Sequence, residues 1–341
     1  MKAELNVTPI SVAGGYWTGS SAIVDLLTEH ERCTAVPAEF TLFSFGQFFS
    51  EVFEPLLQGN TDYGLFDLNV RRMRDFNRSD VRPLRPIIRR LLTYIRHYPI
   101  SFFNPRSDMF KKLGPDYEKC CKGLFKQLDS IKNDPSSANI AELKNRLSGV
   151  LLNAALGATE HTKQSSIKYG VFDQLVAPPF IKPAQLAIPE LKFINVDRDW
   201  RDQYVSMRGR YLHMMARNKK LGLRPFDENL GIVDRLPIDF MSRLRKRIDE
   251  TRRFQEMNPQ KNVLWLDYED IVLDSEKTAK KVFDFLDLDQ DEWKPNQFFF
   301  PEKSKNRIGK WSRGEWLGQP LKNEIDELSE RLGESSSSNL Y

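Results

Sequence analysis

The feature that most constrains the fold is a glycine-rich loop between a short apolar run and a helix-forming segment near the start of the chain. Residues 9–13 form a run that ends in Gly14 and Gly15, and residues 20–29 then place apolar side chains at helical spacing. This order predicts a strand, a tight loop and a helix. Further strands are expected at residues 33–36, 167–172, 191–196 and 263–266, and further helices from residue 201 and at residues 276–286. Such alternation needs crossover connections, so we expect an α/β fold with a parallel sheet flanked by helices.

A long segment between the second and third expected strands interrupts this alternation. Residues 42–160 lack strand signals and show helical periodicity, for instance at Ile87, Leu91 and Ile95, which predicts a large helical insertion. We expect a single α/β domain over residues 1–331 with this insertion inside it. The last residues, 332–341, include a run of serines and are predicted to be a flexible tail.

Composition excludes several classes of protein. Of the 341 residues 40% are apolar, and 51 Lys and Arg nearly balance 47 Asp and Glu, which excludes a disordered chain. No apolar run approaches the ~20 residues of a membrane span, and the first residues lack a secretory pattern. Cys33, Cys120 and Cys121 are too few for a disulfide framework, which favours a reducing compartment. We therefore expect a soluble, cytoplasmic protein.

Positive charge is concentrated in one part of the expected insertion. Residues 70–97 contain nine arginines against two aspartates, a net charge of +7, so the rest of the chain is slightly acidic. Two readings are open. The arginines either form a solvated helical face or make a surface for a polyanion, an anionic glycan or an acidic lipid headgroup.

The glycine-rich loop has the spacing of a nucleotide-binding P-loop. Gly14 and Gly19 are separated like the two glycines of the pattern G-x-x-x-x-G-K-[ST], but Ser20 stands where that pattern has its lysine. Backbone N–H groups and the positive end of a helix dipole can hold an anion without any particular side chain. The absent lysine normally contacts the β- and γ-phosphates. The loop therefore suits a nucleotide with one phosphate-like group at that end, and a purely structural glycine turn is the alternative.

A second anion site is predicted at a later strand. Arg198 lies at the C-terminal end of the strand expected at residues 191–196, and Ser206 follows eight residues later inside the next helix. Ligands of open parallel sheets bind at this edge. An arginine can bind a phosphate through two parallel hydrogen bonds, and a serine hydroxyl can add a neutral donor. The pair predicts a clamp for a second phosphate, whereas an isolated arginine in such a place would be structural.

Four short motifs occur in a recognisable order along the chain. They are residues 13–21, Arg198-Asp199-Trp200-Arg201-Asp202 with Ser206, Tyr268-Glu269-Asp270 with Asp274, and Ser304-Lys305-Asn306-Arg307-Ile308-Gly309-Lys310-Trp311. In this order they resemble V-G-x-P-[RK]-S-G-T-T, R-D-P-R-D-x-x-x-S, Y-E-D-L-x-x-D-P and the C-terminal glycine-tryptophan loop of sulfotransferases that use 3′-phosphoadenosine 5′-phosphosulfate. The resemblance is to glycan-type, bacterial-like members and frames roughly residues 8–312, although residues 42–160 match nothing in particular.

The resemblance implies where the sulfuryl donor binds. The loop would hold the 5′-phosphosulfate, Arg198 and Ser206 would hold the 3′-phosphate, and the C-terminal motif would close over the nucleotide, with adenosine 3′,5′-bisphosphate as the product. The implied donor-binding residues are Gly15, Tyr16, Trp17, Thr18, Gly19, Ser20, Ser21, Arg198, Ser206, Lys305, Arg307 and Gly309. Tyr268-Glu269-Asp270 is expected to be a packing motif. No metal is implied, and the chain has no metal-ligand motif.

Sulfuryl transfer to a hydroxyl needs one base and several cations. As the base we choose Glu39, because glycan and tyrosyl-protein members of the family have a glutamate at a similar place; an exposed loop carboxylate is the alternative reading. Asp173, which ends another expected strand, is the second candidate. Trp17 occupies the position of the family's arginine or lysine, so we expect Lys305 and Arg307 to supply the missing positive charge.

We therefore expect an enzyme that moves a sulfuryl group to an acceptor hydroxyl, above all on a carbohydrate. The helical insertion would lie on the acceptor side and hold a glycan or glycolipid, either neutral or anionic, with peripheral membrane contact allowed and no nucleic-acid partner. The alternatives are a catalytically weak or inactive nucleotide-binding module and a sulfotransferase for tyrosyl peptides or small alcohols. A P-loop kinase is disfavoured by Ser20.

Overall fold

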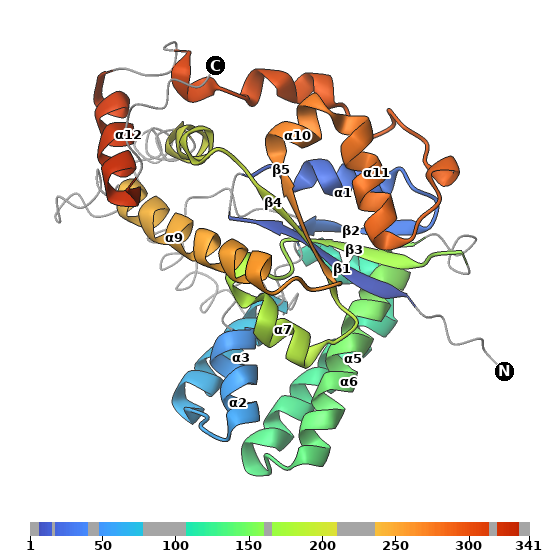
Figure 1. Ribbon diagram of the computed structural model, residues 1–341. Helices are drawn as coiled ribbons and strands as arrows, with labels where there is room; N and C mark the ends of the chain where they lie inside the picture. Colours follow the sequence, from blue (N-terminus) through green and yellow to red (C-terminus); the bar gives the residue numbers. More distant parts are fainter. Residues whose placement is uncertain are drawn as a thin grey trace.

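A five-stranded parallel sheet lies at the centre of the protein (Figure 1). The computed structural model describes residues 7–15, 18–39, 48–77, 107–159, 166–209, 236–313 and 319–333. The strands, in spatial order, are β2 (Cys33–Glu39), β3 (Tyr169–Asp173), β1 (Thr8–Gly14), β4 (Lys192–Asp197) and β5 (Val263–Asp267). Each neighbouring pair is parallel. This arrangement confirms the α/β fold that the alternation of strands and helices predicts.

The strand order gathers the carboxyl ends of the strands at one edge of the sheet. Of the five described strands, β1 ends at Gly14 and the other four end in an acidic residue: Glu39, Asp173, Asp197 and Asp267. Ligands of open parallel sheets bind beyond the carboxyl ends of the strands. A site for an anion at this edge must therefore offset the field of several carboxylates.

Helices cover both faces of the sheet (Figure 1). One face packs against helices whose buried side chains share a core with Ile10, Val12 and Ile194 of the sheet; these helices are α1 (Ser21–Thr28), α10 (Tyr268–Leu273) and α11 (Ser275–Leu286). The opposite face packs against α5 (Ser107–Asn133), α6 (Ser137–Ala158) and α7 (Ile181–Ala187). Beyond the end of β4, α9 (Leu236–Met257) and α12 (Gln319–Leu332) form a third cluster around Tyr204.

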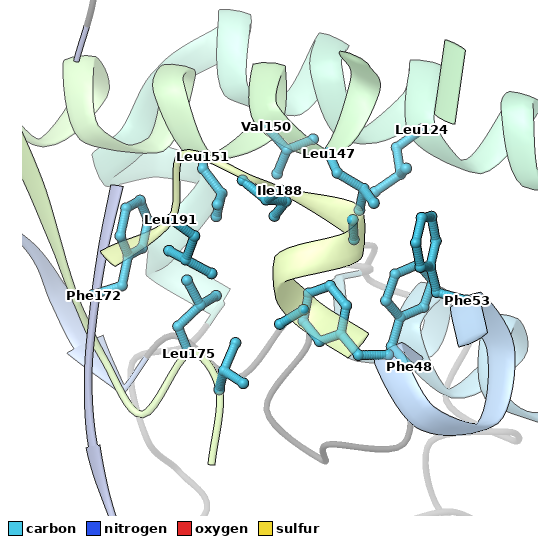
Figure 2. Close-up of a cluster of buried hydrophobic side chains, with 14 of the residues drawn as sticks. Phe48, Phe53, Leu124, Leu147, Val150, Leu151, Phe172, Leu175, Ile188 and Leu191 are labelled. Atoms are coloured by element: carbon cyan, nitrogen blue, oxygen red, sulfur yellow. The ribbon is translucent and has the colours of Figure 1, made fainter. Parts of the chain in front are cut away.

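The described residues of the expected insertion form helices joined by short turns. Besides α5 and α6 they form a short helical segment, Phe48–Phe53, followed by α2 (Glu54–Gln58) and α3 (Tyr63–Asn77). Figure 2 shows Phe48 and Phe53 turned toward Leu124 and Leu147, in one buried cluster with Phe172 of β3. The insertion and the sheet thus share a hydrophobic core, which fixes the insertion against the face that α5 and α6 cover.

Some predictions fall on residues that the structure does not describe. These are Tyr16 and Trp17, the side chain of Glu39, the arginine side chains from residue 71 onward in the arginine-rich segment, and the tail from residue 334. Within the described ranges, no helix is both long enough and apolar enough to cross a membrane. Cys33 and Cys121 are buried, Cys120 is half-buried, and all three are free thiols.

A buried carboxylate fixes the C-terminal part of the chain to α1. Glu29, directly after α1, is only 3% exposed. Its Oε1 accepts hydrogen bonds from the backbone N–H groups of Gln297, Phe298 and Phe299 at 2.7–2.8 Å, and its Oε2 accepts one from Trp293 Nε1 at 2.9 Å. Charge-assisted hydrogen bonds of this kind are the strong ones. They hold the chain where it returns toward α10 and the carboxyl edge of the sheet.

Candidate functional site

The loop after β1 passes through a space that side chains would block. A Cβ atom on Gly14 would lie 2.6 Å from the Val196 carbonyl oxygen, and one on Gly15 would lie 2.0 Å from Ile248 Cδ1 of α9. Gly19 has φ +86°, and its Cβ would lie 2.3 Å from Tyr268 Cε2. Only glycine adopts this conformation without strain. The three glycines therefore let the backbone approach β4, α9 and α10 closely.

The loop ends in hydrogen-bond donors that have no acceptor among the described residues. The first amide of this region with an acceptor is Ala22 N–H, which donates to the Gly19 carbonyl at 3.0 Å. The N–H groups of Ser20 and Ser21 precede it at the positive end of α1. Thr18 is 1% exposed, and its hydroxyl has no hydrogen-bond partner within the described part of the chain. Buried donors are normally paired, so this set suits an anion.

Ser20 is tied to the end of β3. Its hydroxyl donates to Asp173 Oδ1 at 3.2 Å and accepts from Gln174 Nε2 at 2.7 Å. Gln174 has φ +57°, an uncommon conformation for a residue other than glycine. The loop and β3 are thus linked by side chains at the same edge of the sheet. A carboxylate, Asp173, lies directly beside the donor group of the loop.

Arg198 directly follows β4, and the end of β4 is adjacent to the start of the loop, since Val196 is the register partner of Gly14. Its Nη1 donates to Ser206 Oγ at 3.4 Å and its Nη2 to the Arg307 carbonyl oxygen at 2.5 Å. The side chain is 4% exposed. The structure therefore brings together the two residues predicted to clamp a second phosphate, and it adds the backbone of the C-terminal motif to them.

Tyr268 connects the two predicted anion sites. The Arg198 guanidinium carbon lies 4.7 Å from the centroid of the Tyr268 ring, and the same ring contacts Gly19 of the loop. Tyr268 is 2% exposed. Because one side chain touches both sites, they lie within the length of a nucleotide. Tyr268 packs between them, as expected for this motif.

The C-terminal motif is fixed over the helical residues 200–209. Asp202, 1% exposed, accepts N–H bonds from Gly309 at 2.6 Å and Trp311 at 3.0 Å. The guanidinium of Arg201 stacks 4.0 Å from the Trp311 ring centroid. Burial raises the pKa of the Asp202 carboxyl, although the two N–H groups oppose this rise. One carboxylate thus holds the loop that the resemblance implies for closing the site.

The cations of the C-terminal motif are not equivalent. Lys305 is exposed and pairs with Glu302 at 2.7 Å, and Arg307 contributes its carbonyl to Arg198 while its side chain is exposed. Lys310 is half-buried, and burial together with the positive charges of Arg198 and Arg307 lowers its pKa. Lys310 is not among the residues predicted from the sequence, although its position directly after Gly309 in the motif was an available signal.

The two candidate bases lie on adjacent strands. Glu39 of β2 is the register partner of Asp173 of β3, and the sheet order places β3 between β2 and β1. Asp173 is therefore one strand closer to the loop than Glu39. The side chain of Glu39 lies outside the described part of the structure, so its role as a base stays a prediction.

An arginine-rich network that the sequence did not predict lies beside Arg198. Arg245 and Arg252 of α9 both pair with Asp197, and Arg252 also pairs with Asp267 at 2.9 Å. They border a pocket of about 250 Å³ at the ends of β4 and β5; its lining is Asp197, Arg198, Asp199, Trp200, Arg201, Arg245, Arg252, Asp267 and Glu269. Arg245 and Arg252 follow Asp197 by 48 and 55 positions in the sequence. No local sequence pattern predicts a contact over such a separation.

The fold is a parallel α/β fold, and two neighbouring candidate anion sites lie at the carboxyl edge of its sheet. Residues 178–292 match the family model described as "Sulfotransferase family". This match contains β4, Arg198, Ser206 and Tyr268, and it confirms the resemblance to sulfotransferases predicted from the motifs.

Comparison with solved structures finds sulfotransferase domains. One, from the curacin biosynthetic pathway, has 14% identity and a TM-score of 0.41 over 98% of this chain and 99% of the other. Another, from the Synechococcus PCC 7002 olefin synthase, has 14% identity and a TM-score of 0.43 over 97% and 96%. Sulfotransferase STF9 from Mycobacterium avium has 13% identity and a TM-score of 0.40 over 96% and 76%. No curated protein sequence matches the chain significantly.

Proposed function

We propose that the protein is a sulfotransferase that takes its sulfuryl group from 3′-phosphoadenosine 5′-phosphosulfate. The observation that carries the proposal is the contact of Tyr268 with both Gly19 and Arg198. It sets an amide-lined loop and a guanidinium clamp at a separation that one nucleotide with phosphates on both sides of its ribose can span. The family match over residues 178–292 supports the same reaction class.

The residues present fit such a donor. The N–H groups of Ser20 and Ser21 and the buried Thr18 hydroxyl would hold the phosphosulfate, and Arg198 with Ser206 would hold the 3′-phosphate. Lys310 would add a positive charge, since a bound anion relieves the repulsion among the cations around it. When bound, the donor supplies an activated SO₃ group. In the described residues no group of side chains could hold a metal ion.

The chain's own contribution to the transfer is orientation, charge and one proton acceptor. The acceptor oxygen forms a bond to sulfur while the bond to the bridging oxygen breaks, and negative charge grows on the leaving phosphate. The loop amides and Lys310 would stabilise that charge in place of the cation that Trp17 replaces. A carboxylate, Glu39 or Asp173, would accept the proton of the acceptor hydroxyl.

We further propose a carbohydrate hydroxyl as the acceptor. The helical insertion departs from the carboxyl edge of the sheet directly after Glu39, whose register partner is Asp173. A glycan or glycolipid bound beside these two carboxylates would therefore contact the start of the insertion. A tyrosyl peptide and a small alcohol are the alternatives to be compared in the same assay.

The donor assignment is tested by titration. Adenosine 3′,5′-bisphosphate should bind more tightly than ATP by about tenfold or more, because hydrogen bonds to a charged group contribute about 1.5–3 kcal/mol and 1.4 kcal/mol is tenfold. Arg198→Met should abolish most of this preference. Tighter binding of ATP would instead favour a kinase and would overturn the proposal.

Catalysis is tested by transfer of labelled sulfate from the donor to a panel of glycans, tyrosyl peptides and small alcohols. Transfer to a glycan supports the full proposal. Tight binding of the bisphosphate with no transfer to any acceptor would favour the inactive nucleotide-binding module, for which the aromatic residue Trp17 in place of a cation is the specific argument.

A further inference from the structure

Asp197 is a buried carboxylate with an unusual number of cationic partners. It is the last residue of β4, and its side chain is 3% exposed. Arg245 donates to its Oδ1 at 2.5 Å and to its Oδ2 at 3.0 Å, and Arg252 donates to the same Oδ2 at 3.0 Å. A buried charge must be paired to be tolerated. This pairing also places the two guanidinium groups of α9 next to the residue that follows Asp197.

The same network fixes the backbone of Arg198 on both sides. The Arg198 N–H donates to Asp197 Oδ1 at 2.8 Å, and the Arg198 carbonyl oxygen accepts from Arg245 Nη1 at 3.5 Å. Both peptide groups of Arg198 are therefore held by one ion pair. Because a side chain starts from its backbone, this ion pair sets the direction in which the Arg198 guanidinium reaches toward Ser206 and Tyr268.

Arg252 extends the network to the next strand. Its Nη1 donates to Asp267 Oδ1 at 2.9 Å, and Asp267 is the last residue of β5. The side chain of Arg252 is 30% exposed, whereas that of Arg245 is 14% exposed. Arg252 thus joins the ends of β4 and β5 near solvent. Arg245 is more buried and contacts the backbone of Arg198.

We propose that Arg245, through Asp197, is a positioning residue that sets the preference of this protein for a nucleotide with a second phosphate at Arg198. This inference rests on the proposed donor. It assigns to α9 a role in selecting the ligand: Arg245 does not touch the phosphate, but it holds the residue that does. Removing it should weaken binding of the phosphate at Arg198 and leave binding at the loop after β1 nearly unchanged.

The test compares two probes on each variant. Dissociation constants are measured for adenosine 3′,5′-bisphosphate and for adenosine 5′-monophosphate, and their ratio reports the contribution of the 3′-phosphate. In Arg245→Met the ratio should fall by on the order of tenfold, by analogy with residues that orient metal ligands. A purely structural role would weaken both nucleotides together and would not move the ratio.

A second variant and a control keep the test decisive. Arg245→Lys retains a positive charge beside buried Asp197 but loses the planar fork that reaches two acceptors, so the ratio should fall in the same direction. Arg247→Met changes an exposed arginine of the same helix and should leave the ratio unchanged. If Arg245→Lys and Arg245→Met both fold and keep the wild-type ratio, the inference is wrong and the donor proposal stands. If the wild-type protein itself does not prefer the bisphosphate, the donor proposal fails and the inference fails with it.

Discussion

Lys310 and Arg198 are like charges in a partly buried site, where the carboxylate of Asp202 offsets part of their repulsion. Burial and the charges of Arg198 and Arg307 lower the pKa of Lys310. An anion between them would reverse both effects, because it favours the charged form of each. Under the proposed function, Lys310 is therefore a candidate for the cation that the loop lacks.

We expect Lys310→Met to weaken binding of adenosine 3′,5′-bisphosphate by about tenfold, the loss of roughly 1.4 kcal/mol when one partner of a charge-assisted contact is removed. Isothermal titration at two ionic strengths measures it, and the variant should also show a weaker salt dependence. Lys303→Met is the control, since Lys303 lies in the same segment, 3.8 Å over the Phe300 ring. Equal affinities of the two variants would contradict the assignment.

Asp202 gives a prediction about pH. Its folded-state pKa is raised above 3.8, chiefly by burial, so the folded protein binds a proton here more readily than the unfolded chain does. The stabilising contribution of protonation is present below 3.8 and is lost as pH rises through the folded pKa. Asp202→Asn cannot titrate at this position. The stability of the variant relative to wild type should therefore rise with pH across this window, as denaturant unfolding can measure, and the opposite slope would show that the N–H bonds outweigh burial.

At the residue scale, the sequence predicted contacts between residues of one short motif. It did not predict contacts between residues that are distant in the sequence and meet only in the fold. Arg198 and Ser206 were predicted together because a strand end and the following helix fix their separation. Arg245 was not predicted, because its partner Asp197 is 48 residues away and the contact depends on how α9 crosses the end of β4.

The loop after β1 is the element on which both anion sites depend. Gly19 meets two separate demands, a positive φ and a close approach to Tyr268. Alanine in the left-handed region costs roughly 1–2 kcal/mol, and at Gly19 its Cβ would also displace the ring that separates the loop from Arg198. The two contributions can be measured separately, because Gly59 has a positive φ but no atom close to its Cβ position.

Gly19→Ala should destabilise the protein by more than Gly59→Ala and should also weaken binding of the bisphosphate. Gly59 has φ +69° at the end of α2 and open space around its Cβ position. Chemical denaturation of both variants gives the backbone contribution from Gly59→Ala and the clash with Tyr268 from the difference. Equal destabilisation, with ligand binding unchanged in both, would remove Tyr268 from the site.

At the element scale, the sequence predicted where strands lie but less well where they end. The expected strand at residues 33–36 extends to Glu39, and that expected at residues 191–196 is Lys192–Asp197. The acidic final residues of the strands have low strand propensity, so periodicity alone leaves them out. Their place in the sheet follows from pairing with the neighbouring strand, as in the register of Glu39 with Asp173.

At the scale of the whole molecule, Glu29 joins the first and last quarters of the described chain. Its carboxylate takes three backbone N–H groups and an indole N–H from residues 293–299. Glu29→Gln places an amide NH₂ group against one set of these donors, and a buried donor without an acceptor costs about 1–3 kcal/mol. Thermal unfolding should show this loss. The isosteric but unrelated change Glu276→Gln at the start of α11 should be nearly neutral, and similar effects of the two would contradict the anchoring role.

The two faces of the sheet have separate hydrophobic cores. We therefore expect a ligand bound at the carboxyl edge to stabilise mainly the segments on the α1 face. Adenosine 3′,5′-bisphosphate at about 100 times its dissociation constant should stabilise the folded state by about 2.7 kcal/mol. Hydrogen exchange should slow at residues 18–24, the end of the loop and the first turn of α1, and at residues 301–313, which Asp202 holds through Gly309 and Trp311. The α5–α6 hairpin packs on the opposite face and should keep its exchange rates. Protection confined to one of the two segments would mean that a single anion site is used, and protection spread into α5 and α6 would mean that the ligand binds elsewhere.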